Sequence, residues 1–269
     1  MKNNYIYTGD CIETMNTSIN PGSIDLIYAD PPYNLSGKPL NLINNTTGGA
    51  FYKMNEDWDT WDYDEYINFS ELWLTQCFNA LKESGSLYIS CTYHNVGELA
   101  FIGKKLGLSL KNILTWHKSN SMPSITKRVF THSTEFVCWF TKGKNWTYNY
   151  NELKSLNPEK TKDGECKQMR DFINIVETPI VQGKERLKSQ NGRASHPTQK
   201  PEKLLEIIIK ASSNKGELVL DPFFGTGTTG VVAEQLNRRW IGIEVNQEYV
   251  HLAKKRIKEL SCQKQLQLS

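Results

Sequence analysis

The sequence predicts an α/β protein with a doubly wound, mostly parallel sheet. Apolar runs of strand length alternate with longer amphipathic segments along most of the 269 residues, and this alternation is typical of sheets with helices on both faces. The runs are apolar throughout, as in strands that are buried on both sides. A hydrophobic content of 38% suffices for one sizeable core, so we expect a single domain over residues 1–269.

The expected elements follow one another in a regular order. Asp10 begins the first helix as its N-cap, because a carboxylate there accepts hydrogen bonds from free backbone N–H groups. The segment 34–56 has no clear period, and a loop of that length is usually functional or disordered, so we expect a lid over substrate. Strands are expected at 5–8, 24–29, 85–90, 111–118, 135–142, 218–221 and 240–244, and helices at 11–17, 64–82, 96–106, 201–213, 228–237 and 247–260.

The turn Asp30-Pro31-Pro32-Tyr33 follows the buried strand 24–29 and is the predicted catalytic site. The two prolines remove two N–H donors and the carboxylate adds acceptors, so this edge of the sheet is rich in acceptors. Such an edge suits an exocyclic amine, which can donate one hydrogen to Asp30 and the other to the carbonyl of Pro31. Tyr33 offers a ring on which a base can stack. Taken alone, the four residues are equally compatible with an ordinary strand-to-loop turn.

A second turn has the residues of a nucleoside-binding site. The run D-P-F-F-G-T-G-T-T at 221–229 joins an apolar strand to a helix, and Gly225, Gly227 and Gly230 satisfy G-x-G-x-x-G. Glu244 lies roughly twenty residues farther on, where the dinucleotide fingerprint has an acid for the ribose hydroxyls. Close backbone approach and a ribose-binding carboxylate serve any nucleoside cofactor, so this motif alone leaves a nicotinamide dinucleotide open.

These two turns and the run H-P-T-Q-K-P at 196–201 together resemble the amino-methyltransferases of DNA. The order, with D-P-P-Y first and the glycine turn last, is similar to that of their β class. Within that class the chain most resembles the bacterial adenine-N6 methyltransferases of the GANTC and GATC kind. The resemblance extends from Gly9 to about Leu260. It implies a Rossmann-like, seven-stranded, S-adenosylmethionine-dependent methyltransferase fold with permuted motif order, comprising a catalytic half at 1–118, a target-recognition insertion at about 119–195 and a cofactor-binding half at 196–262.

The resemblance also implies which residues bind and react. Asp30, Pro31, Pro32 and Tyr33 are the implied catalytic residues, and S-adenosyl-L-methionine is the implied cofactor. In this scheme Glu244 accepts the ribose hydroxyls, Lys200 holds the cofactor carboxylate and Asp10 borders the cofactor adenine. The residues expected to contact the cofactor are Asp10, Cys11, Asp30, Lys200, Asp221, Pro222, Phe223, Phe224, Gly225, Gly227, Thr228, Thr229, Glu244 and Asn246.

Basic and aromatic residues are interleaved between Ser119 and Ser195, which makes this insertion the expected target-recognition region. A solvated surface insertion is the alternative. His94 follows the strand 85–90 at the same predicted edge as Asp30, so it is also a candidate general base. The residues expected to contact DNA are Asn34, Lys38, Lys53, His94, Asn120, Lys127, Arg128 and Lys144.

The composition is compatible with these expectations. A net charge of +3 and a pI near 8.4 are mildly basic. The six cysteines form no C-x-x-C pair, which favours a reducing compartment, and the five scattered histidines predict no metal site. No apolar run has the length of a membrane span. We therefore expect a cytoplasmic protein. The resemblance implies a nucleoid-associated prokaryotic protein that acts on double-stranded or single-stranded DNA. The resemblance adds a homodimer and, in restriction-modification systems, a cognate restriction endonuclease.

The predicted function is site-specific methylation of adenine N6 in DNA, with the base flipped out of the duplex. N4-cytosine methylation is the nearest alternative, although related cytosine enzymes more often carry Ser in place of Asp30. Methylation of RNA or of a protein amide, a nicotinamide oxidoreductase and a catalytically silent DNA-binding subunit are further alternatives. The residues 121–124 depart from the Pro-x-Pro-Asn run of the GANTC members, so no recognition sequence is predicted.

Overall fold

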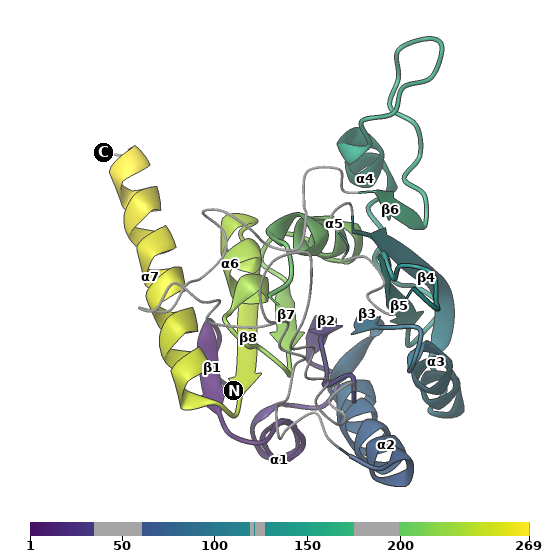
Figure 1. The fold of residues 1–269 in the computed structure, drawn as a ribbon. Coiled ribbons are helices and arrows are strands. Elements are labelled where there is room, and N and C mark those ends of the chain that lie inside the picture. Colours follow the sequence, from purple (N-terminus) through teal and green to yellow (C-terminus); the bar gives the residue numbers. More distant parts are fainter. Residues whose placement is uncertain (35–60, 119–120, 122–126, 175–198, 269) are drawn as a thin grey trace.

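A single sheet in the order β1-β8-β7-β2-β3-β5-β4-β6 runs through the molecule (Figure 1). The computed structural model describes residues 1–34, 61–118, 121, 127–174 and 199–268. Every strand pairing is parallel except the two made by β5, which runs antiparallel to both β3 and β4. The strands are β1 (Tyr5–Thr8), β2 (Ile24–Ala29), β3 (Leu81–Cys91), β4 (Ser109–His117), β5 (Thr134–Thr141), β6 (Phe172–Asn174), β7 (Leu218–Asp221) and β8 (Arg239–Glu244).

Helices cover both faces of this sheet, which confirms the predicted doubly wound α/β class. One buried cluster packs α1, α2 and α3 against one face, and a second cluster packs α4, α5, α6 and α7 against the other. The helices are α1 (Cys11–Ser18), α2 (Tyr63–Ala80), α3 (Val96–Lys105), α4 (Tyr150–Leu156), α5 (Glu202–Ser212), α6 (Thr228–Gln235) and α7 (Gln247–Leu268).

The sheet has one strand more than the seven that the sequence predicted. The extra strand is β6, which comes from the predicted insertion and pairs in parallel with β4 at the edge of the sheet. It is three residues long, which is too short for the apolar periodicity by which strands are recognised. The insertion therefore contributes to the sheet as well as to the surface, and its described part projects beyond α4 (Figure 1).

The junction of α2 and β3 also differs from the expected one. The helix ends at Ala80, and Lys82 belongs to β3. From there Lys82 Nζ reaches Asp25 Oδ1 at 2.5 Å, while Asp25 Oδ2 accepts a hydrogen bond from the backbone N–H of Leu218 at 2.9 Å. Asp25 is buried within β2, and a buried carboxylate requires such partners. One side chain therefore links β2 to both of its neighbours, β3 and β7.

Local signals at the helix starts agree with the sequence. Asp10 caps α1 and accepts hydrogen bonds from the backbone N–H groups of Ile12 and Glu13, both at 2.9 Å. At the start of α2, Asp62 and Glu65 form a reciprocal capping box. Both helices then turn their buried side chains towards the same face of the sheet.

The parallel strands β1, β2, β7 and β8 all point the same way, so their carboxyl ends meet at one edge of the sheet. Asp30, Asp221 and Glu244 lie at this edge. Because β5 runs in the opposite direction, its first residues, including Glu135, lie at this edge too. Among the described residues no helix is long and apolar enough to span a membrane, and no cluster of metal-ligating side chains occurs.

Candidate active site

A cavity of about 270 Å³ opens at the carboxyl ends of the parallel strands. The four residues of the D-P-P-Y turn line it, together with every predicted cofactor residue except Gly227. Gly227 lies just outside the lining, in a left-handed conformation (φ 82°) directly before α6, where a Cβ would lie 2.9 Å from the Cβ of Ala253. A glycine is therefore required at position 227 for the backbone to enter α6.

Several lining residues were not predicted from the sequence. The aromatic side chains of Tyr28, Trp61, Phe69 and Tyr249 contribute much of the apolar wall. Trp61 precedes α2 and Phe69 lies within it, and their ring centroids are 4.2 Å apart. A sequence signal for these two existed, since the aromatic residues at 58–69 directly follow the predicted lid. From the sequence alone, Phe69 is expected in the helix core and Trp61 in the segment that caps the helix.

Asp30 is held by two neighbours from distant parts of the chain. Lys200 Nζ lies 2.7 Å from Oδ1 and 2.6 Å from Oδ2, and the Tyr33 hydroxyl donates to Oδ1 at 2.7 Å. Burial raises the pKa of Asp30 above its ordinary value, and the positive charge of Lys200 limits that rise. Burial and the Asp30 charge raise the pKa of Tyr33, so its phenol stays protonated and continues to donate.

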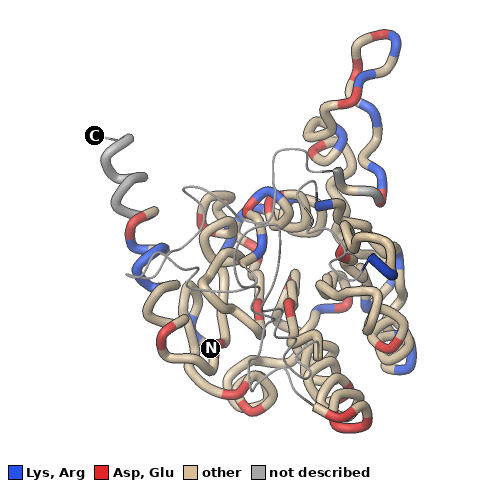
Figure 2. Tube along the Cα trace, in the orientation of Figure 1, with Lys and Arg blue, Asp and Glu red and all other residues tan. Residues whose placement is uncertain are grey.

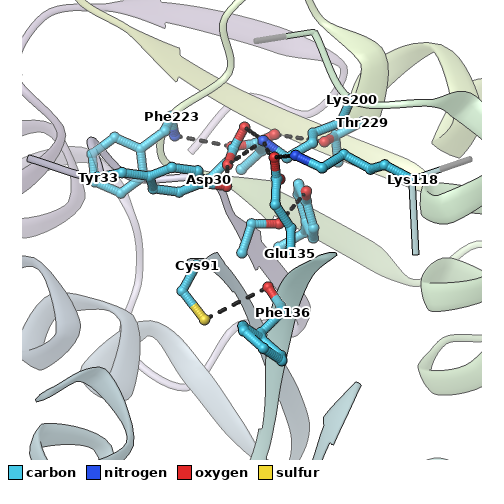
Figure 3. Close-up of polar contacts among 12 residues, drawn as sticks. Asp30, Tyr33, Cys91, Lys118, Glu135, Phe136, Lys200, Phe223 and Thr229 are labelled. Atoms are coloured by element: carbon cyan, nitrogen blue, oxygen red, sulfur yellow. Dashed lines mark hydrogen bonds and ion pairs between the residues drawn. The ribbon is translucent and has the colours of Figure 1, made fainter. Parts of the chain in front are cut away.

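The ammonium of Lys200 is thus paired with Asp30, whereas the sequence analysis expected it to face a cofactor carboxylate. Lys200 is almost fully buried, with 7% of its side chain exposed, and it also lies 3.8 Å from Glu135 Oε2. The other oxygen of Glu135 accepts a hydrogen bond from Lys118 Nζ at 2.8 Å. Four charged side chains therefore alternate in sign in the order Lys118, Glu135, Lys200, Asp30 (Figure 3). Neither Lys118 nor Glu135 was predicted as a site residue.

The glycine turn is organised by Asp221. Its carboxylate accepts hydrogen bonds from the backbone N–H of Phe223 at 2.9 Å and from the Thr229 hydroxyl at 2.5 Å. Burial raises the pKa of Asp221 to about 7, and these two hydrogen bonds oppose the rise. The turn leaves the ring of Phe223 exposed to the cavity and buries that of Phe224 against Trp240, with ring centroids 5.4 Å apart.

Glu244 closes the cavity on the β8 side. Its Oε2 accepts a hydrogen bond from the backbone N–H of Gly225 at 2.7 Å, and its Oε1 accepts one from that of Asn246 at 2.8 Å. Burial raises the pKa of this carboxyl group, and the backbone donors oppose the rise. Each oxygen keeps a second lone pair for a further donor. This arrangement fits the two hydroxyls of a ribose, so the residues present are suited to a nucleoside cofactor.

The predicted DNA contacts are distributed over both edges of the sheet. Lys127 and Arg128 are exposed in the segment that leads into β5, on the same edge as Asp30. His94 is exposed beyond β3, with its ring 3.8 Å from that of Tyr93, and the side chain of Asn34 accepts a hydrogen bond from the backbone N–H of Trp61. Three further predicted contacts, Lys38, Lys53 and Asn120, lie outside the described residues.

Lys144 lies at the opposite edge from the cavity. It follows β5 at the end where the neighbouring Gly143 donates a backbone hydrogen bond to the carbonyl of Glu83. The predicted sheet was mostly parallel with no direction assigned to the strand 135–142, and a parallel β5 would have brought its last residues to the Asp30 edge. Because β5 is antiparallel, the structure does not bring Lys144 towards the site.

Comparison with known proteins gives the class and then the family. A fold of this kind occurs in solved DNA methyltransferases: the crystal structure of the M1.HpyAVI–SAM complex has a TM-score of 0.65 and 27% identity, covering 94% of this chain and 98% of that one. The cytosine-N4-specific PvuII DNA methyltransferase has a TM-score of 0.69 and 22% identity, covering 97% and 91%, and supports the fold alone.

The sequence itself matches the DNA methylase family model over residues 24–255. Type II methyltransferase M.HinfI of Haemophilus influenzae is 40% identical over 262 residues, which are 96% of this chain and 69% of M.HinfI. Type II methyltransferase M2.DpnII of Streptococcus pneumoniae is 39% identical over 245 residues, which are 90% and 85% of the two chains. The chain therefore belongs to the DNA methylase family and is a DNA methyltransferase.

Proposed function

We propose that this protein transfers a methyl group from S-adenosyl-L-methionine to N6 of an adenine within a short DNA sequence. The observation that carries the proposal is that Asp30, at the end of β2, and Glu244, at the end of β8, line one cavity. One end of the cavity thus offers acceptors for an amine, and the other offers acceptors for a ribose.

At the cofactor end, Glu244 accepts the ribose hydroxyls and Asp221 fixes the turn that contacts the nucleoside. The rings of Phe223 and Tyr249 and the side chain of Asn246 complete the wall. When bound, S-adenosylmethionine supplies an electrophilic methyl group, so the protein needs no group to activate it. The work of the protein is to align donor and acceptor, which lowers the barrier chiefly by positioning.

At the substrate end, Asp30 and the carbonyl of Pro31 accept the two hydrogens of the N6 amine. The N6 lone pair is delocalised into the adenine ring and is a weak nucleophile. Hydrogen bonds to both N6 hydrogens favour a tetrahedral nitrogen whose lone pair points at the methyl group, and they strengthen as positive charge develops there. As the N–C bond forms, the bond between the methyl group and the sulfur would break, and Asp30 would take up the proton that the methylated amine releases. Because N6 lies inside the duplex stack, the base is flipped out, and the ring of Tyr33 stacks on it.

The proposal is tested by methyl transfer from labelled S-adenosylmethionine into unmethylated genomic DNA, followed by digestion to nucleosides. N6-methyladenine is the expected product, and N4-methylcytosine would contradict the choice of base. Sequencing of the modified positions then gives the recognition sequence.

Asp30→Asn is expected to lower methyl transfer about 10²- to 10³-fold, because it removes the charge that stabilises the developing cation while it conserves the shape of the side chain. Cofactor binding, measured by calorimetry, is expected to remain. Asp64→Asn, an exposed carboxylate in the first turn of α2, is the matched control and is expected to behave as the wild type. Near-normal turnover of Asp30→Asn would contradict the role of Asp30.

We also propose that DNA lies across the edge that carries Lys127 and Arg128, next to the cavity. Their exposure and charge suit phosphate contacts. A homodimer and a cognate restriction endonuclease remain predictions from the family resemblance. Sedimentation of the purified protein tests the first, and digestion of methylated against unmethylated DNA in a lysate of the source cells tests the second.

A further inference from the structure

Asp30 is the last of the four alternating charges Lys118, Glu135, Lys200 and Asp30, and the proposed function does not explain why it is already paired. Lys200 contacts both oxygens of Asp30, so the carboxylate that is to receive the substrate amine is already neutralised by a lysine. The Lys200 ammonium also lies 5.1 Å from the centroid of the Tyr33 ring. Lys200 thus occupies both features that a flipped base would use.

A lysine in this place opposes the proposed reaction for an electrostatic reason. The amine gains positive charge as the methyl group is transferred, and a nearby ammonium repels that charge. Asp30 stabilises the developing cation most strongly when its own negative charge is not shared with Lys200. The ammonium is therefore expected to leave Asp30 when the base enters.

The Lys200 ammonium is not expected to move into solvent when it leaves Asp30. The Lys200 side chain is only 7% exposed, and an unpaired buried ammonium is costly. Among the described residues, Glu135 is the other carboxylate within 4 Å of Lys200 Nζ. Its Oε2 is buried and accepts no hydrogen bond from any described residue, although it lies 3.8 Å from that ammonium.

We infer that Glu135 is a positioning residue that takes over the Lys200 ammonium when the substrate amine binds to Asp30. A shift of Nζ by about 1 Å turns the 3.8 Å separation into a hydrogen bond. Lys118 holds the other oxygen of Glu135 at 2.8 Å, so Oε2 is already oriented for the exchange. The inference rests on the proposed methyl transfer, but it applies equally to adenine and cytosine, since both carry an exocyclic amine.

Glu135→Gln tests the inference, because glutamine conserves the shape of the side chain and removes the charge that draws Lys200 away. Lys118→Gln is the matched variant, since it breaks the same Lys118–Glu135 ion pair but leaves Glu135 charged. The readout is kcat and KM for total methyl incorporation into DNA, which counts both methylated bases, with the melting temperature and cofactor affinity measured alongside.

We expect Glu135→Gln to lower kcat about 10- to 100-fold and to leave the KM for DNA within about twofold of the wild type. Lys118→Gln is expected to lose several-fold less, and Glu135→Asp, which restores the charge, to recover part of the rate. Equal losses in Glu135→Gln and Lys118→Gln would show a merely structural ion pair and overturn the inference. Unchanged kcat in Glu135→Gln would overturn it as well.

Further outcomes distinguish this inference from a cofactor-binding role of Lys200 and from a failure of the proposed function. A loss of cofactor affinity greater than about tenfold in Lys200→Gln would assign the ammonium to the cofactor carboxylate and overturn the role of Glu135, whereas unchanged affinity supports that role. Absence of methyl incorporation by the wild type would contradict the proposed function and the inference together. If the wild type incorporates methyl groups normally and Glu135→Gln does so at the same rate, only the inference is contradicted.

Discussion

Backbone N–H and hydroxyl donors hold two of the buried carboxylates of the cavity, those of Asp221 and Glu244. Asp221 and Glu244 each accept two hydrogen bonds within the turn regions that they organise. Burial nevertheless raises the pKa of both groups, which means that desolvation outweighs those bonds. The protein gives up stability at these residues to keep buried acceptors in the cavity, as functional sites commonly do.

The raised pKa of Asp221 predicts a pH dependence of stability. Its folded-state pKa of about 7 exceeds the ordinary value of 3.8, so the folded protein binds this proton more tightly than the unfolded chain does. The contribution is fully present below pH 3.8 and is lost as the pH rises through 7. Over this window it amounts to at most about 4 kcal/mol.

Thermal unfolding of the wild type and Asp221→Asn between pH 5 and 8 measures this contribution. The melting temperature of the wild type is expected to fall more steeply with pH, by several degrees across the range, because asparagine does not titrate. Asp64→Asn serves as the control and is expected to follow the wild type. Parallel curves for wild type and Asp221→Asn would show that Asp221 does not titrate in this window.

At the scale of single residues, the sequence predicted the carboxylates but neither the pairing of Asp30 with Lys200 nor the presence of Glu135. Asp30, Asp221 and Glu244 each follow a recognisable apolar run, so local pattern alone places them at a strand end. Lys200 is 170 residues from Asp30 in sequence, and Glu135 reaches the edge only because its strand is reversed. Such pairings depend on the path of the whole chain, which local pattern does not contain.

At the scale of elements, one aromatic ring, that of Phe224, packs the turn after β7 against β8. Phe224 lies over β8, and a Cβ at Gly242 would come within 2.6 Å of its Cδ1 atom. Because Phe224 packs against β8, it holds the glycine turn in a position where the backbone of the turn lines the cavity. Gly242 is therefore a packing requirement of the site, although it does not line the cavity.

Gly242→Ala is expected to destabilise the protein by about 1–3 kcal/mol, because the ring has to leave its place. Gly97→Ala in α3 is the matched control: a Cβ there meets nothing within 4 Å, so the same change is expected to stabilise by about 0.5–1 kcal/mol through helix propensity. Urea unfolding measures both. Equal free energies of unfolding for the two variants would remove the packing role of Gly242.

The sequence pattern left the direction of β5 undetermined. Its apolar run predicted a strand at 135–142, close to the observed Thr134–Thr141, but a strand pattern is the same in either direction. The antiparallel direction places Glu135 at the edge of the sheet that carries the cavity, next to Lys200, and Lys144 at the opposite edge. Strand positions were thus predictable, whereas the composition of the site also required strand direction.

At the scale of the whole molecule, charge is unevenly distributed. Figure 2 shows mainly Lys and Arg on the described part of α7, Asp and Glu on α1 and α2, and both signs in the segment that projects beyond α4. The net charge is only +3, so a DNA-binding surface has to come from local clusters. Lys127 and Arg128 form such a cluster at the edge of the sheet that carries the cavity, whereas the exposed pair Lys254 and Lys255 lies on α7.

DNA affinity as a function of salt concentration distinguishes these two pairs. Replacing Lys127 and Arg128 by alanine is expected to weaken binding and to reduce the slope of log K against log salt by roughly 1–2 units, since each phosphate contact contributes about 0.9. The same double substitution at Lys254 and Lys255 is expected to leave the slope nearly unchanged. Fluorescence anisotropy with a labelled duplex provides the measurement, and equal slopes in the two variants would contradict this placement of DNA.

The link that Asp25 makes between β2, β3 and β7 has a consequence for protein synthesis. The partner of Asp25 on β7, the backbone N–H of Leu218, is made 193 residues later. At typical translation rates this takes about 10–40 s. During that time the nascent chain holds β2 with one hydrogen-bonding edge unpaired. The strand that leads into Asp30 therefore depends on protection at the ribosome until β7 has been made.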